Sequence, residues 1–183
     1  MAKALKVPAV RVKITIRDID PPVWRELVVP GHWHLGMVHR ALQIAFGWHE
    51  AHLHSFQVGD RRYGEPDPTY DSGTQRESLI RVHEVLAAPG DVITYWYDFG
   101  DDWFHDIVVE ELLDPQKQAR CLDGRRAAPP EDSGGPWGYQ DLLQALADPK
   151  HEEHEDQVEW VGEGYDPELV DIQAIDGALR RLS

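Results

Sequence analysis

The segment 10–29 alternates between apolar and polar side chains, as half-buried β-strands do. Between positions 10 and 17 every second residue is valine or isoleucine, which predicts a strand over Val10–Arg17. The turn-forming residues Asp18–Pro22 then interrupt the alternation. A second strand over Val23–Val29 is therefore predicted to pair with the first as an antiparallel hairpin.

The apolar spacing then changes to that of a helix. Apolar residues at helical intervals predict one helix over Leu35–Phe46, and Gly47 is suited to end it. A strand over Leu53–Val58 follows, with a turn at Gly59–Asp60 and a return strand through Tyr63. The first helix is thus expected between two pairs of strands.

The most distinctive segment is an aromatic hairpin in the middle of the chain. Its strands, Val92–Phe99 and Trp103–Leu112, are rich in aromatic and β-branched residues, and Gly100–Asp101 suits a two-residue turn. Because opposed residues share a face, this turn would put Trp96, Asp98, Trp103 and His105 on one side and Tyr95, Tyr97, Phe104 and Asp106 on the other. The Asp98 carboxylate would then lie diagonal to His105 and raise the pKa of its imidazole.

The last third of the chain is dominated by loops and helices. Asp114–Gly135 shows no clear period, helices are predicted over Gly138–Ala147 and His151–Trp160, and Asp171 is suited to cap a final helix. Strands in residues 1–112 and loops and helices in 113–183 together predict one α+β domain spanning 1–183. Its sheet is expected to be mostly antiparallel, with helices packed against it.

Composition supports a folded protein that stays outside the membrane. The 183 residues are 42% hydrophobic, and seven tryptophans, six tyrosines and four phenylalanines supply large core side chains. The single cysteine, Cys121, cannot form an internal disulfide, which points to a reducing compartment. No signal peptide is recognisable, and no apolar run approaches the ~20 residues of a membrane span. We therefore expect a cytoplasmic protein.

The charge argues against an autonomous nucleic-acid binder. The chain carries 33 acidic and 18 basic residues, a formal net charge of −15, whereas tight binding to phosphates requires a basic footprint. The first 62 residues are less acidic than the rest. A nucleic-acid accessory role on that part of the surface therefore stays open.

Two groups of residues have the chemistry of a site. His52 and His54 would point the same way on a strand and could share a divalent metal ion, with ligands from the acids and imidazole of the hairpin; alternatively, one bonds a carbonyl and the other is exposed. Glu131 and Asp132 follow two prolines and precede two glycines, which suits a rigid loop. Such paired acids bind a cation, act as acid and base, or cap the next helix.

Three function classes fit these residues. The first is a non-catalytic module that binds an unknown protein, peptide or small ligand in an aromatic and acidic cleft between the hairpin and the acidic loop. Its expected ligand-binding residues are Trp96, Asp98, Asp101, Asp102, Trp103, His105, Glu131 and Asp132. The second is a metal-dependent hydrolase or nuclease that draws on the same acids and on the histidines. The third is the nucleic-acid accessory factor.

Several segments, in order along nearly the whole chain, resemble the plasmid Ri ORF-three-like family, also described as insertion-element passenger proteins. The most specific matches are 95–105 of the hairpin (YWYDFGDDWFH) and Pro129–Asp132 followed by Gly134–Gly135. Weaker matches are Pro22–Arg25, Val29–Pro30, Phe46–Trp48, His52–Phe56, Cys121–Gly124, Gly138–Tyr139 and Tyr165–Glu168.

The resemblance implies a compact α+β fold with a curled or barrel-like sheet and, for some relatives, association with mobile elements. It implies no established activity. Ser133 stands where many relatives carry cysteine, so a thiol-based mechanism at this loop gains no support.

Overall fold

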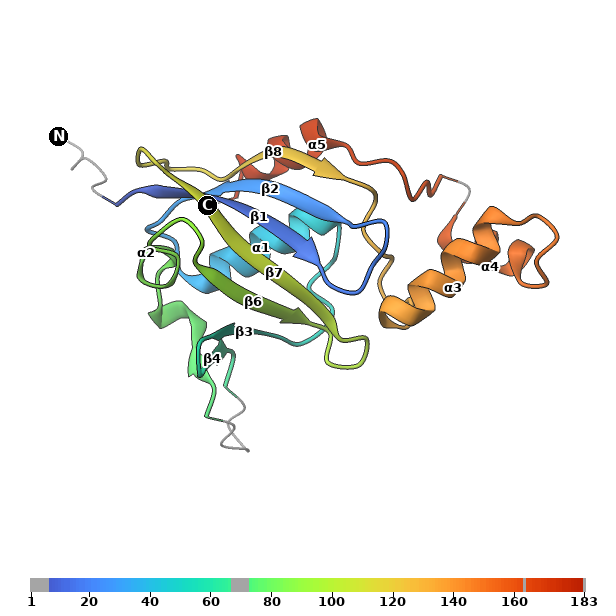
Figure 1. Ribbon diagram of the computed structural model, residues 1–183, viewed down its shortest axis with the longest axis horizontal. Coiled ribbons are helices and arrows are strands. Elements are labelled where there is room, and N and C mark those ends of the chain that lie inside the picture. The colour runs from blue at the N-terminus through green and yellow to red at the C-terminus, as the bar shows by residue number, and fades with distance from the viewer. Residues whose placement is uncertain (1–6, 67–72, 163, 183) are drawn as a thin grey trace.

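The computed structural model describes residues 7–66, 73–162 and 164–182 (Figure 1). One eight-stranded sheet forms its centre, in the order β5-β4-β3-β6-β7-β1-β2-β8, and all neighbours are antiparallel except β4 and β5. The strands are β1 (Ala9–Ile16), β2 (Trp24–Val29), β3 (His54–Val58), β4 (Arg61–Gly64), β5 (Gln75–Arg76), β6 (Val92–Tyr97), β7 (Trp103–Leu113) and β8 (Arg120–Arg125).

The helices cover one face of the sheet and extend past its end. Figure 1 shows α1 behind the strands, and α3 with α4 beyond the end of the sheet where the β6–β7 hairpin turns. The helices are α1 (Leu35–Phe46), the 3₁₀ turn η1 (Glu77–Leu79), α2 (Val82–Val85), α3 (Gly135–Ala147), α4 (His154–Val161) and α5 (Ile172–Leu179). None of the helices within the described ranges combines the length and apolar character needed to cross a bilayer.

The predicted α+β class is confirmed, with a sheet that is open rather than closed into a barrel. The strands expected from alternation and the helices expected from periodicity are present within a few residues, and Gly47 ends α1 in the left-handed conformation. Two strands were not predicted, the two-residue β5 and the six-residue β8. β8 lies in the stretch without a clear period, because only Cys121 of its six residues is buried and so no alternation is visible.

The predicted register of the aromatic hairpin is wrong by one residue. Tyr97 pairs with Trp103 and Tyr95 with His105, so these four side chains share the buried face. The cause is a longer turn: the Asp102 amide donates to the Asp98 carbonyl at 2.7 Å, and both aspartates have positive φ. A one-residue slip of this kind moves every side chain to the other face.

The outer face of this hairpin and the strands beside it carries paired side chains. Trp96 stacks on Phe104 with ring centroids 5.1 Å apart, and Arg17 bonds Asp106 across the same face. Lys13 lies 4.5 Å from the centroid of the Trp24 ring. Aromatic and charged groups here satisfy one another, so this face has few free cations to offer phosphates.

A buried arginine ties the end of α1 to the sheet. Arg25 is 2% exposed, and its Nε donates to the Ala45 carbonyl near the end of α1 at 2.9 Å. Its Nη1 donates to the carbonyls of Trp24 and Arg125 at 2.8 and 3.0 Å. Burial lowers the pKa of this guanidinium to about 10, still high enough to keep its charge at neutral pH. The positive group therefore complements the negative end of the helix dipole.

An acid on α5 hydrogen-bonds the outer edge of the border strand β8. Asp176 Oδ1 accepts from the Cys121 backbone amide at 3.0 Å and from Arg120 Nε at 2.7 Å. The bond to Arg120 is the main reason why the pKa of Asp176 lies below its usual value. The ionised carboxylate thereby satisfies a backbone amide of β8 that has no neighbouring strand.

His105 lies in the core, and its environment is opposite to the one expected from an Asp98 neighbour. Its ring packs against Trp48 and Phe46, and its Nδ1 lies 3.0 Å from the Trp103 carbonyl oxygen. Burial lowers the pKa of His105 to about 4, although its backbone hydrogen bonds oppose the shift. The imidazole is therefore neutral in the folded protein at neutral pH.

This neutral imidazole should make the protein less stable in mild acid. The unfolded chain takes up a proton on this residue below about pH 6.5, whereas the folded chain does so only near pH 4. Between these values stability falls as the pH falls, by up to about 1.4 kcal/mol per pH unit. Urea unfolding of the wild type and of His105→Gln at several pH values tests this. The variant should show the shallower dependence, and equal slopes would contradict the assignment.

Candidate functional site

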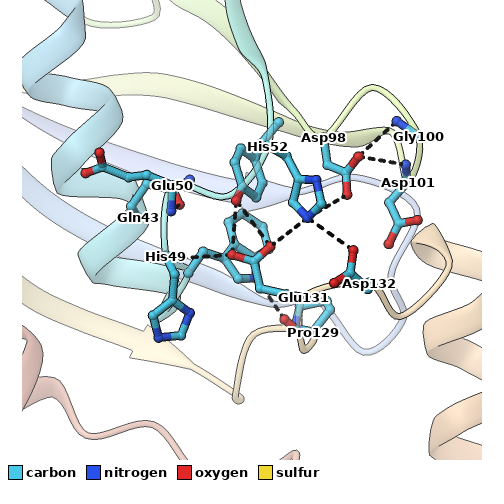
Figure 2. A network of polar contacts seen from close by, with 12 residues as sticks. Gln43, His49, Glu50, His52, Asp98, Gly100, Asp101, Pro129, Glu131 and Asp132 are labelled. Carbon is cyan, nitrogen blue, oxygen red and sulfur yellow. Dashed lines mark hydrogen bonds and ion pairs between the residues drawn. The ribbon is translucent and has the colours of Figure 1, made fainter.

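His52 lies where three carboxylates from two other segments converge. Its Nε2 is 3.6 Å from Asp98 Oδ2, 3.5 Å from Glu131 Oε2 and 3.1 Å from Asp132 Oδ1. Figure 2 shows the three contacts meeting at one ring nitrogen. Asp98 comes from the β6–β7 turn and the other two acids from the loop that precedes α3. The hairpin and the acidic loop, more than 30 residues apart in sequence, thus meet at this histidine.

The nitrogen at the centre lacks an ordinary hydrogen bond. His52 Nε2 is buried from solvent, yet none of the three carboxylates meets it with hydrogen-bond geometry. Buried polar atoms in folded proteins nearly always have a partner, and exceptions call for an explanation. Asp132 is the open member of the group, because its side chain is 72% exposed.

The spacing of the donor atoms matches that around a small divalent ion. An ion bound to nitrogen and oxygen at about 2.1 Å holds neighbouring donors about 3.0–3.4 Å apart. The three distances from His52 Nε2 are 3.1, 3.5 and 3.6 Å, and donor atoms of His52, Asp98 and Asp132 all lie within 4.8 Å of one another. Glu131 reaches His52 but lies outside that group of three, so its carboxylate would have to move closer to the other acids to share an ion.

The hairpin turn fixes the Asp98 carboxylate. Its Oδ1 accepts from the backbone amides of Gly100 and Asp101 at 2.9 and 3.3 Å, which leaves Oδ2 directed at His52. Asp98 is 7% exposed and has a φ of 56°, a left-handed conformation that aspartate tolerates better than most residues. Asp132 shares this conformation, with a φ of 60°. Both acids thus lie on unusual local backbone, and the hairpin turn also orients the Asp98 carboxylate.

Glu131 is fixed in the same manner by groups from the rest of the chain. Its Oε1 accepts from the His49 backbone amide at 2.9 Å and from the Tyr97 hydroxyl at 3.0 Å, so Oε2 faces His52. Burial raises the pKa of Tyr97 well above its usual value, and the hydrogen bond to Glu131 and the charge of that residue raise it further. Tyr97 therefore remains a donor. Orientation of acidic side chains by such outer partners is typical of metal sites.

Further contacts fix the loop itself. Trp48 stacks on Tyr97 with ring centroids 4.9 Å apart, and its indole nitrogen donates to the Pro129 carbonyl at 2.9 Å. At the other end of the loop, the Gly134 amide donates to Asp101 Oδ2 at 2.9 Å. The site therefore has little freedom to rearrange before a ligand arrives.

The structure separates His54 from His52. His54 Nε2 lies 2.8 Å from Glu77 Oε2, and its ring stacks on His39 with centroids 3.5 Å apart. His39 in turn lies 2.7 Å from the Tyr95 hydroxyl. Burial and the neighbouring His54 lower the pKa of His39 to about 3, which fits a neutral ring in a polar core network. His54 is therefore positioned for packing and for its bond to Glu77.

The other predicted site residues divide between the core and the surface. Trp103 and His105 are inside, 1% and 0% exposed, and do not reach the cluster. Trp96 is on the outer face and donates to Asp102 Oδ1 at 2.9 Å. Sequence reasoning did not single out Tyr97 as a partner of Glu131. The correct register would have placed the Tyr97 hydroxyl on the face of the sheet that meets the acidic loop. The local sequence around Tyr97, however, carries no pattern that indicates this contact.

Comparisons with known proteins identify relatives along nearly the whole chain. A family model described as plasmid pRiA4b ORF-3-like protein matches residues 8–174. The uncharacterized protein y4hQ of Sinorhizobium fredii (strain NBRC 101917 / NGR234) is 37% identical over 180 residues, 95% of this chain and 92% of that protein.

A solved structure shares the fold. The crystal structure of a protein of unknown function, MM3350 from Methanosarcina mazei Go1, matches with a TM-score of 0.83 and 33% identity. The match covers 91% of this chain and 97% of that one. Neither name assigns an activity to its protein.

Proposed function

We propose that this chain, which belongs to the plasmid pRiA4b ORF-3-like family, binds one divalent metal ion through His52, Asp98, Glu131 and Asp132. One observation carries the proposal: a buried imidazole nitrogen without a hydrogen bond lies 3.1–3.6 Å from three carboxylate oxygens. A bound cation would satisfy that nitrogen and offset the charge of the acids at the same time.

The donor set favours a transition ion over calcium or magnesium. Calcium and magnesium prefer oxygen ligands, whereas an imidazole nitrogen suits zinc, iron and related ions, and carboxylates suit manganese as well. One nitrogen and up to three carboxylates therefore point to Mn²⁺, Fe²⁺ or Zn²⁺. Three carboxylates around a doubly charged ion leave a net negative site, which disfavours anionic substrates such as phosphodiesters.

Hydrolysis is the second candidate function, and the exposure of the site supports it. The Asp132 side chain is 72% exposed and that of His52 26%, so water could reach an ion between them. A bound ion of this class lowers the pKa of its water and supplies a nucleophile near neutral pH. Release of p-nitrophenol from a neutral ester by the metal-loaded chain tests this function, with the metal-stripped chain as its control.

Metal analysis provides the direct test of ion binding. Protein without a histidine tag is stripped with EDTA, loaded separately with Mn²⁺ and Zn²⁺, desalted and analysed by mass spectrometry of the elements. We expect about one ion per chain and a rise in thermal midpoint that grows with ion concentration. Calcium at the same concentration serves as the matched control and should have the smaller effect.

A metal-free alternative makes a different prediction. In it, a protonated His52 links the three carboxylates as a structural ion pair. The stripped protein would then bind less than about 0.1 ion per chain and show no ion-dependent midpoint. Either result decides between the two arrangements.

A further inference from the structure

A groove beside the ion site has the shape and charge of a binding surface. It lies between the β1–β2 turn, the tip of the β6–β7 hairpin and the start of α3, which lie near one another in Figure 1. Its volume is about 840 Å³, within the range of sites that hold a small ligand or a few side chains. It shares no residue with the His52 cluster, although the amides of Gly100 and Asp101 in its lining bond the Asp98 carboxylate.

The charge of this groove has one sign. Its lining includes Asp18, Asp20, Asp101 and Asp102 and no lysine or arginine. Asp101 and Asp102 each use one oxygen within the hairpin and loop, whereas Asp18 and Asp20 are exposed. The adjacent Arg17 bonds Asp106 and Thr94 on the outer face of the sheet, and its charge also acts on Asp18.

A large aromatic ring at the rim is left open to solvent. Trp137, in the first turn of α3, is 81% exposed, the largest exposure among the big apolar side chains of the described residues. Tryptophan is enriched among the residues that dominate binding energy, and its face attracts guanidinium and ammonium groups. An open indole in the same groove as exposed aspartates therefore matches the two properties of arginine, a planar face and a positive charge.

The groove is formed before any ligand arrives. The Gly134 amide bonds Asp101 Oδ2 at 2.9 Å, and Gly135 lies so close to the hairpin that an added Cβ would be 2.4 Å from the Asp101 carbonyl oxygen. A preformed surface loses less conformational entropy on binding. The net charge of −15 also attracts a cationic partner from a distance.

We propose that this groove binds an arginine-containing basic segment of a partner protein, with its guanidinium groups on Trp137 and between Asp18 and Asp20. Nucleic acid does not suit it, because the surface repels phosphates. The groove thus adds a protein-recognition surface to the proposed ion-binding function and does not rest on that function.

Binding of short peptides tests the proposal. The probes are a blocked peptide of alternating arginine and alanine, its lysine counterpart and its glutamate counterpart, measured by calorimetry in EDTA at low and high salt. We expect the arginine peptide to bind more tightly than the lysine peptide, the glutamate peptide not to bind, and salt to weaken binding. Trp137→Ala and the double variant Asp18→Asn/Asp20→Asn should each lower the affinity for the arginine peptide by about tenfold or more.

A matched control separates the groove from the general charge. Glu153 and Asp156 line a separate hollow and not the groove, so Glu153→Gln/Asp156→Asn changes the net charge equally without touching the groove. The affinity of this control variant for the arginine peptide should stay within about twofold of the wild-type value. Equal weakening by both double variants, no binding of the arginine peptide at low salt, or binding of spermidine equal to that of the peptide would each overturn the proposal. The metal analysis above is unaffected by any of these outcomes.

Discussion

Replacing His52 with alanine should lower the affinity for Mn²⁺ or Zn²⁺ by about a hundredfold or more. Mutation of residues that only orient metal ligands already changes metal affinity by about 10- to 100-fold. His52 supplies the nitrogen atom, Nε2, on which all three carboxylates converge. Without it, the remaining donors come from two segments and have only oxygen to offer. Calorimetric titration of the stripped variant with each ion measures the loss.

His49→Ala is the matched control for this variant. His49 is three residues away, is exposed, and contributes to the site through its backbone amide, which the substitution keeps. Its ring points away from the cluster in Figure 2. The control should bind the ion as the wild type does. Equal affinity of His52→Ala and His49→Ala would remove His52 from the site.

The same variant also separates ion binding from the ion-pair alternative. If His52 is a metal ligand, His52→Ala should lose the ion-dependent rise in thermal midpoint, while its midpoint without ions changes little. If a protonated His52 links the carboxylates instead, the loss of stability should appear without any ion, because three acids would be left facing one another. Thermal unfolding with and without Mn²⁺ measures both quantities.

Gly135→Ala should disrupt the contact on which the site and the groove both depend. A Cβ at this position would lie 2.4 Å from the Asp101 carbonyl oxygen, which is backbone and cannot rotate away. The residue also has a φ of 70°, which L-residues adopt at a cost of about 1–2 kcal/mol. With about 1–3 kcal/mol more from overpacking, we expect a loss of several kcal/mol in the free energy of unfolding, together with weaker ion binding.

Gly134→Ala isolates the steric part of this effect. Gly134 has the same left-handed backbone, with a φ of 81°, but an added Cβ would meet only an ordinary contact at 3.4 Å. The free energy of unfolding of Gly134→Ala should therefore fall only by the cost of the left-handed backbone, about 1–2 kcal/mol. Urea unfolding and ion titration of the two variants give the comparison. Equal losses in both variants would mean that the close approach between loop and hairpin is not needed.

The sequence allowed most of the fold to be predicted because local periodicity decides it. β1 and α1 each bury one face, so their apolar spacing is visible without knowledge of their neighbours. β8 escaped prediction because its place in the sheet depends on pairing with β2, 90 or more residues away. The hairpin register failed for another reason: the Asp98 side chain bonds two amides of its own turn, which stabilises a longer loop than Gly100–Asp101 suggested.

The residues that form the site could be predicted from the sequence, but the contacts between them could not. Asp98, Glu131, Asp132 and His52 were candidates because acids and imidazoles cluster in the sequence, and the structure brings these four together. Their distances depend on how the loop packs on Trp48, and no local pattern encodes that contact. For the same reason, His54 looked equivalent to His52, although Glu77 binds it elsewhere.

The bond from Asp176 to the Cys121 amide bears on how this protein behaves at high concentration. A border strand with free amides can recruit a strand from another molecule, and such recruitment leads to fibres. Here a helix carboxylate occupies one such amide of β8, and at the opposite border β5 has only two residues. Both margins of the sheet are thereby poor templates for further strands, which favours separate molecules over polymers joined through their backbones.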